Sequence, residues 1–136
     1  MLDIKYIAEH PEEIKDGLAK KGYTKETLDV DALIALYRDI AKLKTSSQAL
    51  SEEKNKLSNS IKSAAAEERP AIIAKSKSVG EELKFEQEKL AAEQSKFDDM
   101  MLRMPNMPSP ESPVGKDDSE NVVRRKVGTP RSFDFT

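Results

Sequence analysis

Residues 64–70 read Ala-Ala-Ala-Glu-Glu-Arg-Pro and separate two long stretches of regularly spaced apolar residues. Proline suits the first turn of a helix, where its missing N–H would have no partner, but it disrupts the interior of a continuous helix. Pro70 is the only proline between Tyr23 and Met104. The sequence therefore predicts that one helix ends near residue 64, that the chain reverses at a tip over about 64–71, and that a second helix follows.

Each flanking stretch carries a heptad pattern, with seam positions spaced alternately three and four residues apart. On the N-terminal side the seam runs through Leu33, Leu36, Ile40, Leu43, Ser47, Leu50, Lys54, Leu57, Ile61 and Ala64. On the C-terminal side it runs through Ile72, Ser76, Val79, Leu83, Glu86, Leu90, Glu93, Phe97, Met100 and Met104. Two helices of roughly 35 residues, each about 50 Å long, are predicted.

Folding the two seams back on each other pairs them in one consistent antiparallel register. No polar seam residue then faces another polar one, and Lys54 and Glu86 fall in neighbouring layers where they could form an ion pair. A parallel homodimer would instead place Lys54 against Lys54. We therefore predict an intramolecular antiparallel hairpin over residues 29–104, with a self-associating coiled coil as the alternative.

The segment before the hairpin, residues 1–28, is predicted to form a short helical cap. Pro11 followed by Glu12 and Glu13 is a helix start signal, because carboxylates suit the positive end of a helix. Gly22 can adopt the left-handed conformation that ends such a helix. The predicted fold class is all-α: a long antiparallel two-helix coiled-coil hairpin with a short N-terminal helical cap and an extended, proline-rich C-terminal linker over 105–136.

The composition fits an elongated helical protein better than a compact globule. The 136 residues are 35% charged and 37% hydrophobic, so the supply of core-forming residues is small. The lack of cysteine excludes disulfides and thiol nucleophiles, and a single histidine excludes a multi-histidine metal site. No apolar run is long enough to span a membrane. We expect a soluble cytoplasmic protein without a membrane partner.

No residue is predicted to be catalytic, to bind a cofactor or to ligate a metal. His10 precedes Pro11 without a nucleophile or paired acid motif beside it, and we interpret it as a helix-cap residue. The carboxylate pairs Asp98-Asp99 and Asp117-Asp118 are interpreted as solvated helix-face and turn acids rather than as metal ligands or acid–base groups.

Motifs at both ends of the chain carry a family resemblance. The chain opens with MLDIKYI at residues 1–7 and HPEEIK at 10–15. After the hairpin it continues with PNMP at 105–108, VGKDDSEN at 114–121 and GTPR at 128–131. Together with the long heptad hairpin, these motifs resemble the N-terminal part of bacterial-type seryl-tRNA synthetases, over essentially the whole chain.

The resemblance implies that residues 1–104 are a tRNA-binding arm and that 105–136 lead towards a class II catalytic domain absent from this chain. For the full-length protein it implies serine–tRNA ligase activity with ATP and Mg, in a cytoplasmic homodimer formed through the catalytic domain. The partner would be serine tRNA, recognised by its long variable arm, and the fragment itself is expected to be monomeric. The alternative is a free-standing coiled-coil interaction or scaffold protein.

Basic residues gather in the distal half of the hairpin, the half nearer the tip. Residues 54–77 hold six basic and two acidic side chains, whereas residues 78–104 hold four basic and seven acidic ones. This pattern fits an arm that contacts phosphates and equally an ordinary solvated coiled coil; the resemblance favours RNA. The predicted RNA-binding residues are Lys54, Lys56, Lys62, Arg69, Lys75 and Lys77.

Two details qualify this set. Lys54 differs from the other five because the heptad places it in the seam rather than on the outer surface. Lys84, Lys89 and Lys96 lie towards the acidic base and are expected to contribute little to RNA binding. No aromatic residue lies between Gln48 and Glu82, so the distal arm offers no stacking platform for single-stranded bases. Recognition is therefore expected to depend on RNA backbone and shape.

Overall fold

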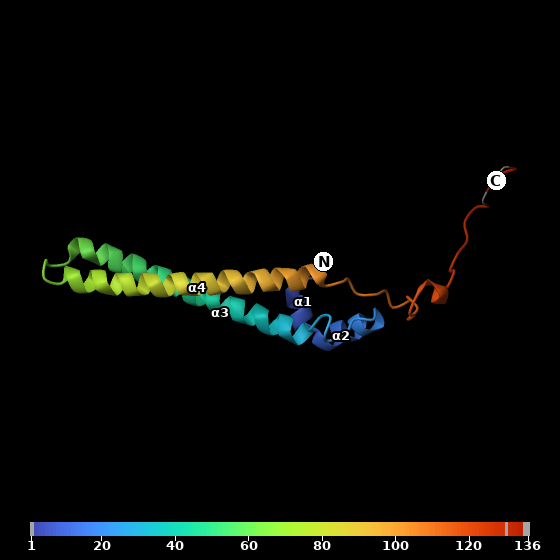
Figure 1. Cartoon of the computed structure of the whole chain (residues 1–136), viewed down its shortest axis with the longest axis horizontal. Helices are drawn as coiled ribbons and strands as arrows, with labels where there is room; N and C mark the ends of the chain where they lie inside the picture. The colour runs from blue at the N-terminus through green and yellow to red at the C-terminus, as the bar shows by residue number, and fades with distance from the viewer. Residues whose placement is uncertain (1, 130, 135–136) are drawn as a thin grey trace.

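The computed structural model describes residues 2–129 and 131–134, and the regular structure in this part of the chain is helical. Its elements, in chain order, are α1 (Ile4–Glu9), α2 (Pro11–Lys20), α3 (Val30–Ser63), α4 (Arg69–Arg103) and the 3-10 turn η1 (Asp118–Glu120). α3 and α4 lie side by side from the tip to the base, and α1 and α2 pack at the base (Figure 1). The predicted all-α hairpin with an N-terminal helical cap is confirmed.

The reversal between α3 and α4 occupies fewer residues than the sequence predicted. α3 ends at Ser63 and α4 begins at Arg69, so the non-helical tip covers residues 64–68 rather than 64–71. Pro70 lies inside the first turn of α4, where the lack of an N–H leaves no hydrogen bond unmade. Arg69 Nε donates to the carbonyl oxygen of Ala64 at 3.1 Å, which ties the two sides of the tip together.

The heptad seam is the packing surface of the hairpin. Every seam position except Lys54 is buried or partly buried. Lys54 is exposed and makes no ion pair with Glu86 among the described salt bridges, so the pairing that the register suggested is not formed. The Ser47 hydroxyl is buried without a hydrogen-bond partner, and this layer therefore stabilises the hairpin less than an apolar layer would.

Burial is concentrated at the base of the hairpin. Ile7, Ile14 and Leu33 are fully buried, and they belong to a core that α1, α2, α3 and the end of α4 build together. Towards the tip, the buried apolar side chains become few, with Val79 and Leu83 the most distal ones on α4. The base is therefore the anchor of the molecule, and the hairpin projects from it as an arm.

Local signals set the ends of the cap helices. Asp3 caps α1 by accepting from the Lys5 N–H at 2.7 Å. α2 ends as the sequence predicted, because Gly22 has a φ of 76°, in the left-handed region. The Tyr23 N–H bonds the Leu18 carbonyl and the Gly22 N–H bonds the Ala19 carbonyl, both at 3.0 Å, which is the Schellman pattern.

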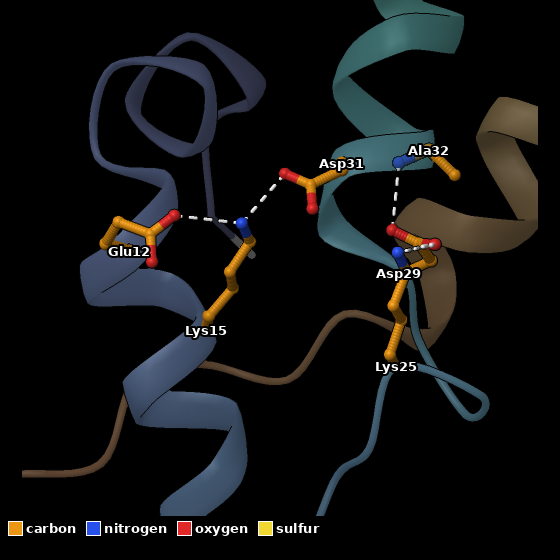
Figure 2. A network of polar contacts seen from close by, with 6 residues as sticks. All are labelled: Glu12, Lys15, Lys25, Asp29, Asp31 and Ala32. Carbon is orange, nitrogen blue, oxygen red and sulfur yellow. Dashed lines mark hydrogen bonds and ion pairs between the residues drawn. The ribbon is translucent and has the colours of Figure 1, made fainter.

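A polar network joins α2 to the start of α3 (Figure 2). Lys15 Nζ lies 2.9 Å from carboxylate oxygens of both Asp31 and Glu12, and these bonds raise the pKa of Lys15. Asp29 caps α3 by accepting from the Ala32 N–H at 3.0 Å, and this bond, together with Lys25 at 3.6 Å, lowers the Asp29 pKa.

The two pKa shifts act at opposite ends of the pH scale. A raised lysine pKa stabilises the fold at pH values below the unfolded pKa of ~10.4, and this stabilisation is lost as the pH rises through the folded pKa. A lowered aspartate pKa stabilises the fold above the unfolded pKa of ~3.9, and this stabilisation is lost as the pH falls through the folded pKa. The Lys15 and Asp29 contacts are thus both intact around neutral pH.

The start of the linker is fastened to α2 and does not hang free. Lys21 Nζ donates to the Asn106 carbonyl, and the Met107 side chain lies directly over Gly17. A Cβ at Gly17 would lie 2.8 Å from the Met107 sulfur and closer still to its terminal methyl, so the Met107 side chain would have to move aside for any larger residue. Beyond Pro108 the described linker residues are exposed and lead away from the base (Figure 1).

Candidate nucleic-acid interface

The six predicted RNA-binding residues all lie on the distal half of the arm and are all exposed. Three are on the last part of α3 and three on the first part of α4: Lys54, Lys56, Lys62, Arg69, Lys75 and Lys77. Each of the six side chains is therefore accessible to a nucleic acid. They are not equivalent, however, because their local contacts differ.

Two of the six take part in holding the tip together. Arg69 bonds the Ala64 carbonyl, and Lys75 Nζ lies 2.9 Å from Glu53 Oε1 across the hairpin. Both members of the Lys75–Glu53 pair are largely exposed, at 62% and 44%, so solvent screens the pair and its net contribution is small. The Glu53 carboxylate nevertheless offsets part of the charge that Lys75 could offer to a phosphate.

Lys54 and Lys77 line one shallow groove where α3 and α4 meet. Its volume is about 610 Å³, and it is lined by Lys54, Ile61, Ile73, Ser76, Lys77, Gly80, Glu81 and Lys84. Gly80 forms part of the floor: a Cβ there would be 3.6 Å from Lys54 Cε, so the Lys54 stem lies across the glycine. The groove brings three lysines together around a small apolar floor.

Lys84 also lines this groove, although its position in the sequence suggested that it lies towards the base. A signal for its placement exists, since Lys84 follows Lys77 by seven residues and two turns of helix return to the same face. A count of charges over residues 54–77 leaves Lys84 out, because Lys84 lies beyond this range in the sequence. Lys84 is therefore not a suitable representative of the base.

The remaining candidates do not converge on the groove. Residues two apart on a helix point in nearly opposite directions, so Lys75 lies across α4 from Lys77, and Lys56 lies across α3 from Lys54. The ion pair of Lys75 with Glu53, which does not line the groove, agrees with this placement. The basic side chains of the distal arm are thus divided between two faces.

Asp98, Asp99 and Asp117 take part in helix-surface and capping contacts. Asp98 accepts from Gln94 Nε2 at 2.9 Å, and Asp99 lies 3.8 Å from Arg103 one turn later. Asp117 accepts from the N–H of Ser119 at 2.9 Å at the start of η1.

His10 lies between α1 and α2, with its ring 4.6 Å from that of Tyr6, and makes no side-chain capping hydrogen bond. Within residues 2–129 and 131–134, no three His, Asp or Glu side chains are grouped to hold a metal ion. The same part of the chain contains no helix long and apolar enough to cross a bilayer.

The fold and the groove define a class of protein: a long antiparallel helical arm, basic near its tip, mounted on a small helical base. Comparison with known families shows which family has this architecture. Residues 1–108 match the model of the seryl-tRNA synthetase N-terminal domain, and the chain belongs to this family.

Relatives match over nearly the whole chain. The serine–tRNA ligase of Deinococcus radiodurans is 36% identical over 136 residues, covering 100% of this chain and 31% of that protein. The serine–tRNA ligase of Burkholderia vietnamiensis is 38% identical over 137 residues, with 99% and 31% covered. The chain thus spans about a third of the length of these curated relatives, 31% in both cases.

A solved structure shares the fold. Seryl-tRNA synthetase from Pyrococcus horikoshii, crystallised in complex with ATP, superposes with a TM-score of 0.76 at 31% sequence identity. The match covers 90% of this chain and 28% of that chain. The resemblance inferred from the motifs is therefore confirmed.

Proposed function

We propose that residues 1–104 form the tRNA-binding arm of a seryl-tRNA synthetase and that residues 105–136 form the linker towards its catalytic domain. The observation that carries the proposal is an exposed basic distal half on a helical arm of the seryl-tRNA synthetase N-terminal family. The arm recognises serine tRNA by its long variable arm. Its lysines neutralise backbone phosphates and release the counterions condensed on the RNA.

The balance of basic and acidic side chains differs between the distal half of the arm and its base. Seven basic side chains against four acidic ones over residues 54–84 attract phosphate, while three against five over residues 85–104 repel it. RNA is thereby directed to the distal half and away from the base. Since no aromatic residue lies between Gln48 and Glu82, contacts there are to backbone and shape rather than to stacked bases.

For the full-length protein we propose ATP- and Mg-dependent attachment of serine to serine tRNA by a class II catalytic domain, in a cytoplasmic homodimer formed through that domain. The relatives named serine–tRNA ligase and the solved relative in complex with ATP support this assignment. We assign no residue of the ATP or magnesium site to this chain. Its part in the reaction is to bind and position the tRNA.

An electrophoretic mobility shift experiment tests the proposal. The chain is titrated against serine tRNA and, as the control, against an alanine tRNA that lacks a long variable arm. We expect tighter binding of serine tRNA, with a log–log salt slope near −2 to −3 if about three phosphates are neutralised. Equal affinity for both RNAs, or no binding, would reject the proposal in favour of a coiled-coil interaction or scaffold protein.

A further inference from the structure

We infer that the arm has one RNA-facing side, and that the groove over Gly80 seats a stretch of the RNA sugar-phosphate backbone between Lys54, Lys77 and Lys84. This inference rests on the proposed function and makes it more specific. It assigns a contact role to Lys84 and a spacing role to Gly80. It also removes Lys56 and Lys75 from the interface.

The shape of the groove depends on Gly80. Without a side chain at this position, the Lys54 stem lies across the helix surface, and a hollow of about 610 Å³ remains between the two helices. Its apolar floor includes Ile73, which is 53% exposed, and the partly buried Ile61. Because Gly80 has no side chain, the Lys54 stem can lie flat against α4, whereas a large side chain at this position would displace it.

The charges around the groove favour a polyanion. Lys54 and Lys77 form none of the described salt bridges, so both ammonium groups are available. Lys84 lies 3.8 Å from Glu88, farther apart than Lys75 and Glu53 at 2.9 Å, and both side chains are largely exposed, so this pair is the weaker competitor of a phosphate. Three lysines face one lining carboxylate, Glu81.

The spacing favours a chain of phosphates over a single anion. Lys77 and Lys84 are seven residues apart, which is about 10 Å along the helix axis. A strand running along the groove can meet both lysines with two of its phosphates, whereas a lone phosphate ion bridges two lysines this far apart less readily. On the opposite side of α4, Lys75 is already paired with Glu53 at 2.9 Å, which leaves that side less attractive to RNA.

Two double variants with the same change of charge test the choice of face. Lys77→Gln with Lys84→Gln removes two cations from the groove, and Lys56→Gln with Lys75→Gln removes two from the other side. All four side chains are exposed, and circular dichroism checks that helicity is retained. Affinity for serine tRNA is measured by fluorescence anisotropy between about 0.05 and 0.3 M salt, where counterion release dominates.

We expect the groove variant to bind about thirtyfold more weakly at ~0.1 M salt and to flatten the log–log salt slope by about 1.5, the value for two lost phosphate contacts. The opposite-face variant should lose no more than about threefold, a change expected from long-range charge alone. A third variant, Gly80→Leu, fills the groove without changing charge and should also weaken binding. Gly80→Ala is its milder partner, since the added Cβ makes only ordinary contacts, at 3.6 and 3.7 Å.

Equal losses in the two double variants, or a larger loss on the Lys56–Lys75 side, would overturn the groove assignment while leaving the arm as the tRNA-binding element. Full binding by Gly80→Leu would overturn the spacing role of Gly80. If the unsubstituted chain shows no preference for serine tRNA over alanine tRNA, the proposed function fails, and the groove assignment fails with it.

Discussion

Replacing Leu33 by alanine is expected to lower the free energy of unfolding by about 2–5 kcal/mol, the range for truncating a fully buried leucine. Leu33 has no exposed surface and lies in the core shared by the cap helices, α3 and the end of α4. The cavity left there would loosen the contact of the base with the arm. Urea unfolding followed by circular dichroism measures the change.

Leu102 provides the matched control, because the substitution is the same and the position lies near the same end of the hairpin. Its side chain is 76% exposed, and Leu102→Ala should change stability by no more than about 0.5 kcal/mol. Similar losses in both variants would mean that burial of Leu33 in the core of the base does not stabilise the fold.

The second large effect is expected on RNA binding. Replacing Lys54, Lys77 and Lys84 together by glutamine should weaken serine-tRNA binding about a hundredfold at ~0.1 M salt and flatten the salt dependence by 2 to 3, if each lysine neutralises about one phosphate. The three side chains are exposed, and the partner of Lys84 in its one described salt bridge, Glu88, is exposed too, so their removal leaves no buried charge unpaired. Titrations at several salt concentrations give the affinity and the slope.

A charge-matched control replaces Lys42, Lys89 and Lys96 by glutamine nearer the base. Lys42 is paired with Asp39 at 2.9 Å and Lys96 with Glu93 at 3.0 Å, so their charges are partly neutralised already. Lys84 is left out of this control because it lines the distal groove. Binding should fall by about twofold or less, and a loss equal to that of the distal variant would show that affinity follows total charge.

The hairpin could be predicted from sequence because its determinants are local or periodic. The seam positions repeat every three and four residues, and this spacing alone places them on one face of each helix. The position of Pro70 then requires a new helix start, which the structure confirms. The one seam position that the pattern misplaced is Lys54, because its long side chain can leave the seam and lie across Gly80.

The division of the basic residues between two faces of the arm could not be predicted by counting charges along the sequence. It depends on which side of the seam each lysine falls, and on the cross-hairpin pair of Lys75 with Glu53, which is fixed only when the two helices are in register. The contact of Met107 with Gly17 likewise joins residues far apart in the chain. Neither feature has a local sequence signal of its own.

The central claim, that the arm recognises the long variable arm of serine tRNA, is tested most directly by shortening only that arm. Serine tRNA and the same RNA with its variable arm cut to the length found in most tRNAs are titrated against the chain in one buffer. We expect the shortened RNA to bind about tenfold more weakly or worse, since it has lost the phosphates that meet the distal lysines. Unchanged affinity for the shortened RNA would contradict the account.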